Sequence, residues 1–177
     1  MRRIRVCCCL AVVMALIPAP AGFTQTPANT QGGPVPPAIV AAKSIFVSNA
    51  GSDSGLFPAP FSGDPDRPYK QFYAALKATG DYTLVSDPSQ ADLVLELRLT
   101  APYGPTSPNK QNGAADPLPM FRLVVYDAKT HYVLWTVTRS IDVAYLQKTH
   151  DRNFDEALSN LLNQFLQVAG KLPVPAH

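Results

Sequence analysis

The sequence has few of the residues from which many protein sites are built. Its three cysteines are consecutive, at Cys7 to Cys9, and it has one tryptophan and three histidines in 177 residues. Charged residues make up only 16% of the chain. Because no cysteine follows Cys9, the rest of the chain can form no disulfide and no thiolate metal site.

The first 21 residues have the three-part layout of a secretory signal peptide. Three arginines precede a 12-residue apolar run, Val6 to Ile17, and the small-residue stretch Ala19-Pro20-Ala21 follows it. The run is shorter than the ~20 residues that a membrane-spanning helix needs. We therefore expect cleavage after Ala21 and a mature protein that is periplasmic or secreted, without a membrane span.

Positive charge is scarce once that segment is set aside. The whole chain has 15 basic and 13 acidic residues, and three of the basic ones lie in the first five positions, which leaves 12 against 13. A nucleic-acid-binding domain carries a basic patch or stripe. The charge balance therefore predicts no nucleic-acid partner.

Composition divides the mature chain into a leader and one domain. Residues 22–38 are rich in proline, glutamine, threonine and glycine, and they have too little apolar surface to fold. We expect a flexible leader there, a single α/β domain over 39–172 and a short tail over 173–177.

Apolar spacing in this domain predicts the order β-α-β-β-β-β-α. A helix over 67–79 is expected to be capped by Asp64 or Asp66 and to end at Gly80, and a closing helix is expected from Asn153. Asn153 with Glu156 resembles a capping box. The strands are expected at 43–49, 82–86, 93–99, 120–127 and 132–143.

The strands alternate between apolar and polar residues, which is typical of a sheet with one covered face. The expected fold class is therefore α+β: a two-layer sandwich with a mixed or mostly antiparallel sheet of four to five strands and two helices on one face. Apolar side chains of the closing helix should share a core with the strands; these are Leu158, Leu161, Leu162 and Phe165 with Leu93, Leu95, Leu97 and Val125.

Four stretches carry a resemblance to known proteins: SIFVSN at 44–49, FYAALKATGDYTLVSDPSQADLVLELRL at 72–99, FRLVVYDAKTHYVLWTV at 121–137 and NFDEALSNLLNQFL at 153–166. The matching positions lie in two phrases within them, DPSQADLVLELRL at 87–99 and YDAKTHYVLW at 126–135. The chain resembles, over about residues 43–170, bacterial envelope domains of the curli-assembly lipoprotein family and the amino-terminal domain of TolB. The resemblance implies this fold and an envelope location. The sequence departs from that pattern by lacking the lipid-accepting cysteine and by having His131 where a turn glycine is usual. The matching positions are Asp87, Ala91, Asp92, Leu93, Asp127, Thr130 and Trp135.

No catalytic or metal-binding motif in the sequence is complete. Gly51–Gly55 has Asp53 where a nucleophile elbow needs serine. His131, His150 and His177 are too far apart in sequence to suggest a zinc site. We therefore predict no catalytic residue, no cofactor and no metal.

Two polar groups leave a choice of interpretation. His150 and Asp151 would suit an acid/base pair, but Asp151 also suits a negative charge at a helix N-terminus. Asp53, Asp64 and Asp66 would suit calcium, but the order of ligands in an EF-hand is missing and helix capping also explains the latter two. We favour the structural interpretation in both cases.

Candidate interaction residues lie in three strands: Arg98, Arg122, Arg139 and Trp135. The arginines would bind an anionic group if they gathered on the outer face of the sheet, whereas cross-strand ion pairs with Glu96 are the alternative. Arg139 shares its strand parity with Trp135, so it needs a bulge or a strand end to reach that face. Trp135 belongs either to the core or to an aromatic patch.

These observations favour an exported, non-enzymatic envelope or secreted protein that serves as a macromolecular interaction or assembly module, with an envelope protein as partner. The alternative is a small-molecule binder or an enzyme whose pocket is formed by the long loops 50–65 and 101–119.

Overall fold

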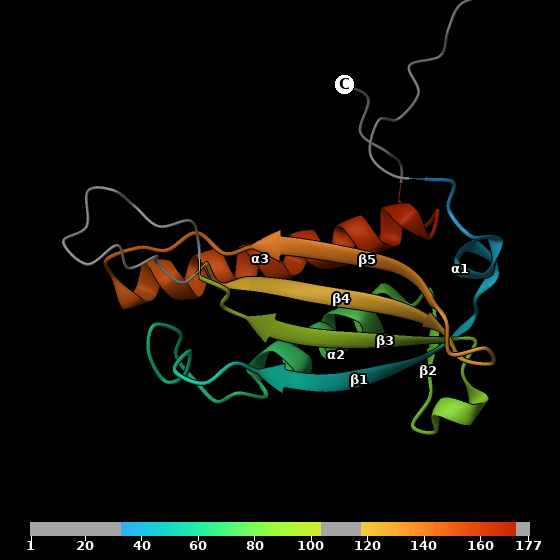
Figure 1. Cartoon of the computed structure of the whole chain (residues 1–177), viewed down its shortest axis with the longest axis horizontal. Coiled ribbons are helices and arrows are strands. Elements are labelled where there is room, and N and C mark those ends of the chain that lie inside the picture. Colours follow the sequence, from blue (N-terminus) through green and yellow to red (C-terminus); the bar gives the residue numbers. More distant parts are fainter. Residues whose placement is uncertain (1–32, 104–117, 173–177) are drawn as a thin grey trace, which may run out of the picture. The chain divides into compact units, whose positions relative to one another are not determined.

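The computed structural model describes residues 33–103 and 118–172, and its main element is a mixed five-stranded sheet. The strand order is β2-β1-β3-β4-β5 (Figure 1). β1 is parallel to β2 and β3, whereas β4 is antiparallel to β3 and β5. The strands are β1 (Ser44–Ser52), β2 (Thr83–Leu84), β3 (Leu93–Thr100), β4 (Met120–Asp127) and β5 (Val133–Ser140).

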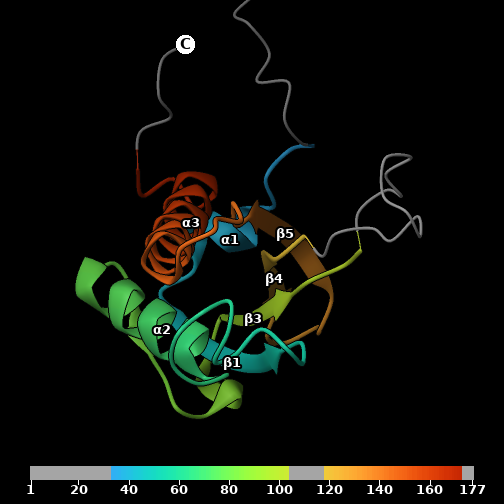
Figure 2. The same ribbon diagram turned by 90° about the vertical axis from the view of Figure 1, so that its left-hand side faces the viewer.

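The two long helices, α2 (Arg67–Thr79) and α3 (Gln147–Val168), lie on one face of the sheet (Figure 2). α2 has the bounds that its apolar spacing predicts, and it ends at Gly80, whose φ of 73° is the left-handed conformation that favours glycine. The predicted α+β class, with two helices on one face, is therefore confirmed.

The core fills the space between this face and the two helices. The leucines of β3 alternate inward, and Leu93, Leu95 and Leu99 are completely buried. α3 adds Leu158, Leu161, Leu162 and Phe165, all buried in the same cluster. The Phe121 and Phe154 rings meet edge to face with centroids 4.9 Å apart, a favourable aromatic geometry. The predicted packing of the closing helix against the sheet is confirmed.

α3 begins six residues before the predicted start, and the predicted capping box at Asn153 is wrong. Asn153 lies inside the helix, where its side-chain amide donates to the Asp142 carbonyl at 2.8 Å. The first helical residues, from Gln147 to Arg152, are polar. They extend the helix without extending its apolar stripe, and the stripe was the signal from which the start was predicted.

The start of α2 also differs from the prediction. Asp66 occupies the N-cap position without a side-chain capping bond, and its carboxylate instead accepts from the Asn49 side chain at 2.9 Å. Asp64 accepts from the Asp66 backbone N–H at 2.9 Å and forms a local turn. Asp64 therefore holds the chain just before the helix, while Asp66 ties that helix end to β1.

Two segments add core residues that the sequence analysis did not predict. The helix α1 (Pro37–Ala41) begins within the proline-rich stretch that was expected to be leader, and its Ile39 is completely buried. The loop after β1 contributes Leu56 and Phe61, both buried. Neither segment has regular apolar spacing. The expected signal peptide, most of the leader and the tail lie outside the described residues.

Candidate functional site

We call the face of the sheet opposite α2 and α3 the open face (Figure 2). Among residues 33–103 and 118–172, no helix lies on this face. Strand register brings Phe46 of β1, Val94 of β3 and Tyr126 of β4 into one row, which Val133 extends onto β5. The first three are partly exposed, and Val133 is 56% exposed. We call these four residues the apolar row.

A pair of arginines lies on the same face, two rows away from the apolar row. Arg98 and Arg122 stand directly opposite each other on β3 and β4, and both are exposed. Like charges in this position repel. Arg98 is compensated by Asp53, whose carboxylate is 2.9 Å from the guanidinium. The open face therefore joins an apolar region to a positively charged one.

The other two predicted interaction residues lie apart from this pair. Arg139 is paired with Phe121 and Trp135 with Val125, so both belong to the parity of the helix-covered face. Arg139 is exposed near the end of β5, but this strand end does not bring it to the open face. Trp135 packs against the core but is partly exposed. The structure therefore brings together two of the four residues.

Asp53 fixes the end of β3, the strand that carries Arg98. Its carboxylate accepts from the Thr100 hydroxyl at 2.7 Å and from the Ala101 N–H at 3.0 Å, in addition to Arg98. These hydrogen bonds, with Thr100 the largest contributor, lower the pKa of Asp53 to about 2. The stretch that superficially resembles a nucleophile elbow is therefore a clamp between β1 and β3. Sequence reasoning missed this role because nothing in the local pattern places Asp53 beside β3.

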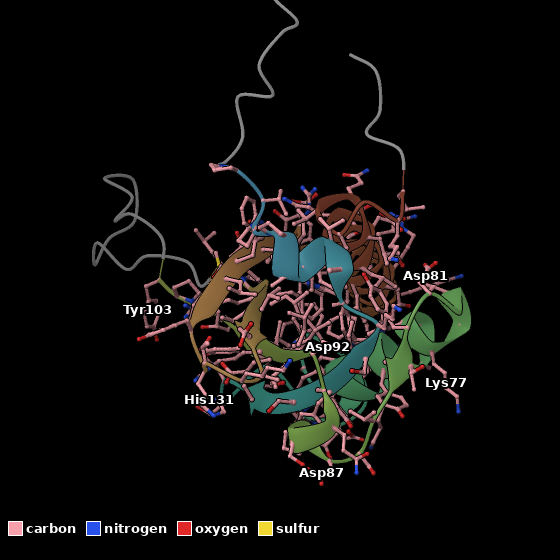
Figure 3. The ribbon with its side chains drawn as sticks, turned by 90° about the vertical axis from the view of Figure 1, so that its right-hand side faces the viewer. Lys77, Asp81, Asp87, Asp92, Tyr103 and His131 are labelled. Carbon is pink, nitrogen blue, oxygen red and sulfur yellow. The ribbon has the colours of Figure 1, made fainter. Side chains whose placement is uncertain are left out.

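Asp92, in the phrase that resembles envelope domains, has the matching role at the opposite end of the same two strands. It accepts from the N–H groups of Lys43 and Ser44 at 2.9 and 3.0 Å and from the Ser44 hydroxyl at 3.0 Å. These bonds lower the pKa of its carboxyl group. Asp92 lies where β1 and β3 begin (Figure 3). Its role is to fix strand register.

Asp127, in the second phrase, shapes the hairpin between β4 and β5. Its carboxylate accepts from the N–H groups of Lys129 and Thr130 at 2.9 and 2.7 Å and from the Thr130 hydroxyl. His131 follows with a φ of 59°, a left-handed conformation that is unfavourable for a side chain with a β-carbon. The exposed His131, labelled in Figure 3, therefore occupies a position suited to the glycine expected there.

The adjacent His150 and Asp151 have separate partners. Asp151 accepts from Arg67 at 2.6 Å and from the Ser62 N–H at 3.0 Å. Burial opposes the charged form, but these hydrogen bonds outweigh it and lower the pKa of Asp151 to about 2. The His150 ring lies edge-on to Phe61, with centroids 5.9 Å apart. Asp151 is not in the first turn of α3, so its predicted role as an N-terminal charge is also wrong.

Arg67 connects α2, α3 and the loop after β1. Besides Asp151, it pairs with Asp155 at 2.8 Å and donates to the Ser62 carbonyl at 2.9 Å. Its guanidinium carbon is 4.2 Å from the centre of the Phe154 ring. The side chain is 14% exposed. The charged residues near His150 therefore have a structural role: they link α2, α3 and the loop after β1.

Two other predictions concern metal ions and pockets. Within the two described segments, no group of three or more His, Cys, Asp or Glu side chains is placed to hold a metal ion. Of the two loops in the alternative hypothesis, most of 101–119 lies outside the described residues. Loop 50–65 turns Leu56 and Phe61 inward. A groove of about 350 Å³ lies instead between α2 and α3, where Phe72, Leu158 and Leu162 contribute to its lining.

No helix among the described residues has the length and apolar character needed to cross a membrane. No family model matches the chain, and no curated protein matches it.

Several solved structures are similar to the chain at low identity. A DUF4136 family protein from Bacteroides thetaiotaomicron is 14% identical and has a TM-score of 0.49, over 75% of this chain and 91% of that one. The PelC dodecamer from Paraburkholderia phytofirmans is 18% identical, with a TM-score of 0.40 over 68% and 87%. TolB from Acinetobacter baumannii is 13% identical, with a TM-score of 0.36 over 71% of this chain and 28% of TolB.

Proposed function

We propose that this chain is an exported, non-enzymatic envelope protein that binds another protein through the open face. The single observation that carries this proposal is that the apolar row and the pair Arg98 and Arg122, two rows apart, share one face that no helix of the described residues covers. The signal-peptide layout of the first 21 residues and the resemblance to envelope domains support the location.

The chemistry of the open face indicates what it would recognise. Covering the partly exposed apolar side chains with a partner would favour binding by roughly 25 cal/mol per Å² of apolar surface buried. Arginine binds carboxylates through charge-assisted, often bidentate hydrogen bonds. Arg98 and Arg122 also repel each other, so an anionic group placed between them relieves that repulsion. The expected partner is a polypeptide with an acidic side chain close to an apolar or aromatic one.

Affinity capture with point variants tests this proposal. The mature protein, residues 22–177, is used as bait in an envelope extract of the source cells, and captured proteins are identified by mass spectrometry. Arg122→Glu reverses one charge of the pair, and Val94→Asp places a carboxylate in the apolar row. We expect both variants to lose the same captured protein, because one disrupts the arginine pair and the other disrupts the apolar row of the same face.

The matched control is Arg152→Glu, a charge reversal at an exposed position of α3. It should retain the captured protein. The purified partner should then bind Arg122→Glu at least tenfold more weakly than wild type. Capture that is equal for wild type and both open-face variants would contradict the proposal.

A further inference from the structure

The two edges of the sheet differ in what they offer to another chain. β2 forms one edge and is only two residues long. β5 forms the other edge, is eight residues long, contains no proline and has a single charged residue, Arg139. A long edge strand with few charges is a template for pairing with another strand. The capacity for strand addition therefore lies at β5.

The hydrogen-bond ladder shows which groups of β5 face outward. The Ile141 N–H donates to the Pro119 carbonyl at 2.8 Å, across β4 and the end of β5. Residues opposite each other in an antiparallel ladder alternate between bonded and non-bonded pairs. The next bonded pairs are therefore Phe121 with Arg139 and Leu123 with Val137.

The intervening residues of β5, Thr136, Thr138 and Ser140, direct their N–H and C=O groups away from β4. All three side chains are exposed. Within residues 33–103 and 118–172, no backbone hydrogen bond joins these outward groups to another residue. The free edge therefore presents donors and acceptors at every second residue.

We propose that two copies of this chain pair through β5, antiparallel and two-fold symmetric about Val137. The outward groups lie on even-numbered residues, so a bonded register must place even residues opposite even residues. Symmetry about Val137 places Thr136 opposite the partner's Thr138, a favourable cross-strand pair. The interface is the same patch on both copies, as in most soluble dimers.

The side chains beside this edge favour the register about Val137. In it, Trp135 lies opposite the partner's Arg139, and the symmetric contact forms a second time. Both residues share the parity of one sheet face, Arg139 is exposed and Trp135 is partly exposed. An arginine over an indole ring is a favourable cation–π contact. A register about Thr138 would instead place Arg139 opposite the partner's Val137, without this contact.

The proposal does not depend on the proposed function, because it uses the edge of the sheet and not the open face. It is tested by sedimentation velocity of the mature protein over a range of concentrations. We expect a reversible dimer for wild type, and dilution should shift the fluorescence of Trp135, the only tryptophan in the chain. Wild-type protein that stays monomeric at every concentration overturns the proposal.

Thr138→Pro removes one outward N–H and leaves the bonds to β4 in place, a substitution that edge strands tolerate. We expect monomers with secondary structure like that of wild type. Arg139→Ala should raise the dimer dissociation constant about tenfold or more, because two cation–π contacts are lost together, and Arg152→Ala on α3 is the matched control. Dimers that resist both β5 variants would show that another surface is responsible.

Cysteine trapping keeps the test decisive if Thr138→Pro does not fold, since the mature chain has no cysteine of its own. Thr136→Cys and Thr138→Cys are purified separately, then mixed and oxidised. The register about Val137 predicts a mixed disulfide dimer that forms faster than either self-linked dimer. Self-linked Thr138→Cys as the dominant product would overturn this register, and no linked product would overturn the dimer.

Discussion

The covered face and the open face of the sheet are formed by the same strands but differ in what surrounds each side chain. Along β3, Leu95 is completely buried beneath the helices, while its neighbours Val94 and Glu96 are partly exposed on the open face. The covered face stabilises the fold, whereas the side chains of the open face remain within reach of solvent.

The largest expected difference between the faces is a core truncation. Leu95→Ala should lower the free energy of unfolding by about 2 to 5 kcal/mol, because it removes buried methyl groups and leaves a cavity. Val94→Ala, one residue away in the same strand, should cost less than about 1 kcal/mol. Chemical denaturation of both variants measures this, and equal losses would contradict the assignment of the two faces.

A smaller contrast is expected between two arginines. Arg67→Ala should cost about 2 kcal/mol, since the 14% exposed Arg67 pairs with Asp151 and Asp155 and packs on Phe154. Arg98→Ala should cost less than about 1 kcal/mol, because Arg98 is 53% exposed and its loss also relieves repulsion with Arg122. Thermal melts compare the two, and a costlier Arg98→Ala would reverse their assigned roles.

Low pH should lower the free energy of unfolding through the carboxylates of Asp53 and Asp151. The folded-state pKa values of Asp53 and Asp151 are about 2, below the ordinary 3.8. Because both pKa values are depressed, their stabilisation is complete above pH 3.8 and is lost as the pH falls toward 2. After solvent screening each contributes about 1 kcal/mol. Asp53→Asn and Asp151→Asn should each flatten part of this loss in denaturation at pH 2 to 5, and unchanged slopes would contradict the assigned pKa shifts.

The smallest effect, and the only stabilising one, is expected at the hairpin next to the open face. His131→Gly should raise the free energy of unfolding by up to about 1 kcal/mol, because glycine adopts the observed φ of 59° without strain. Part of that gain is offset by the greater freedom of glycine in the unfolded chain. Lys129→Gly in the same turn serves as the control and should not stabilise. A lower melting temperature for His131→Gly would contradict the expected strain.

The sequence predicts the elements whose apolar spacing is regular. α2 and β4 have their predicted bounds, and the leucines of β3 face the core as expected. The beginning of α3 and the helix α1 were not predicted, because polar or proline-rich residues form them. Phe61 was missed for a related reason: it is buried from an irregular loop, where no periodicity marks an inward position.

The candidate site was predictable only in part, because strand parity is local whereas partners are distant. Parity placed Arg98 and Arg122 on one face and raised the question of Arg139. It could not show that Asp53 reaches Arg98, 45 positions further along the chain. The apolar row did have a signal: Val94 interrupts the polar positions of β3, although the sequence analysis assigned that face to solvent.

The parallel pairing of β1 with β3 has a consequence for when the chain can fold. Asp92 accepts hydrogen bonds from N–H groups that lie 48 or more positions earlier in the chain. Much of the remaining core comes from α3, which is near the carboxyl end. Distant contacts of this kind delay folding, because a long loop must close before any contact forms. In the export proposed above the amino end leaves first, so the core cannot be complete until α3 has also emerged.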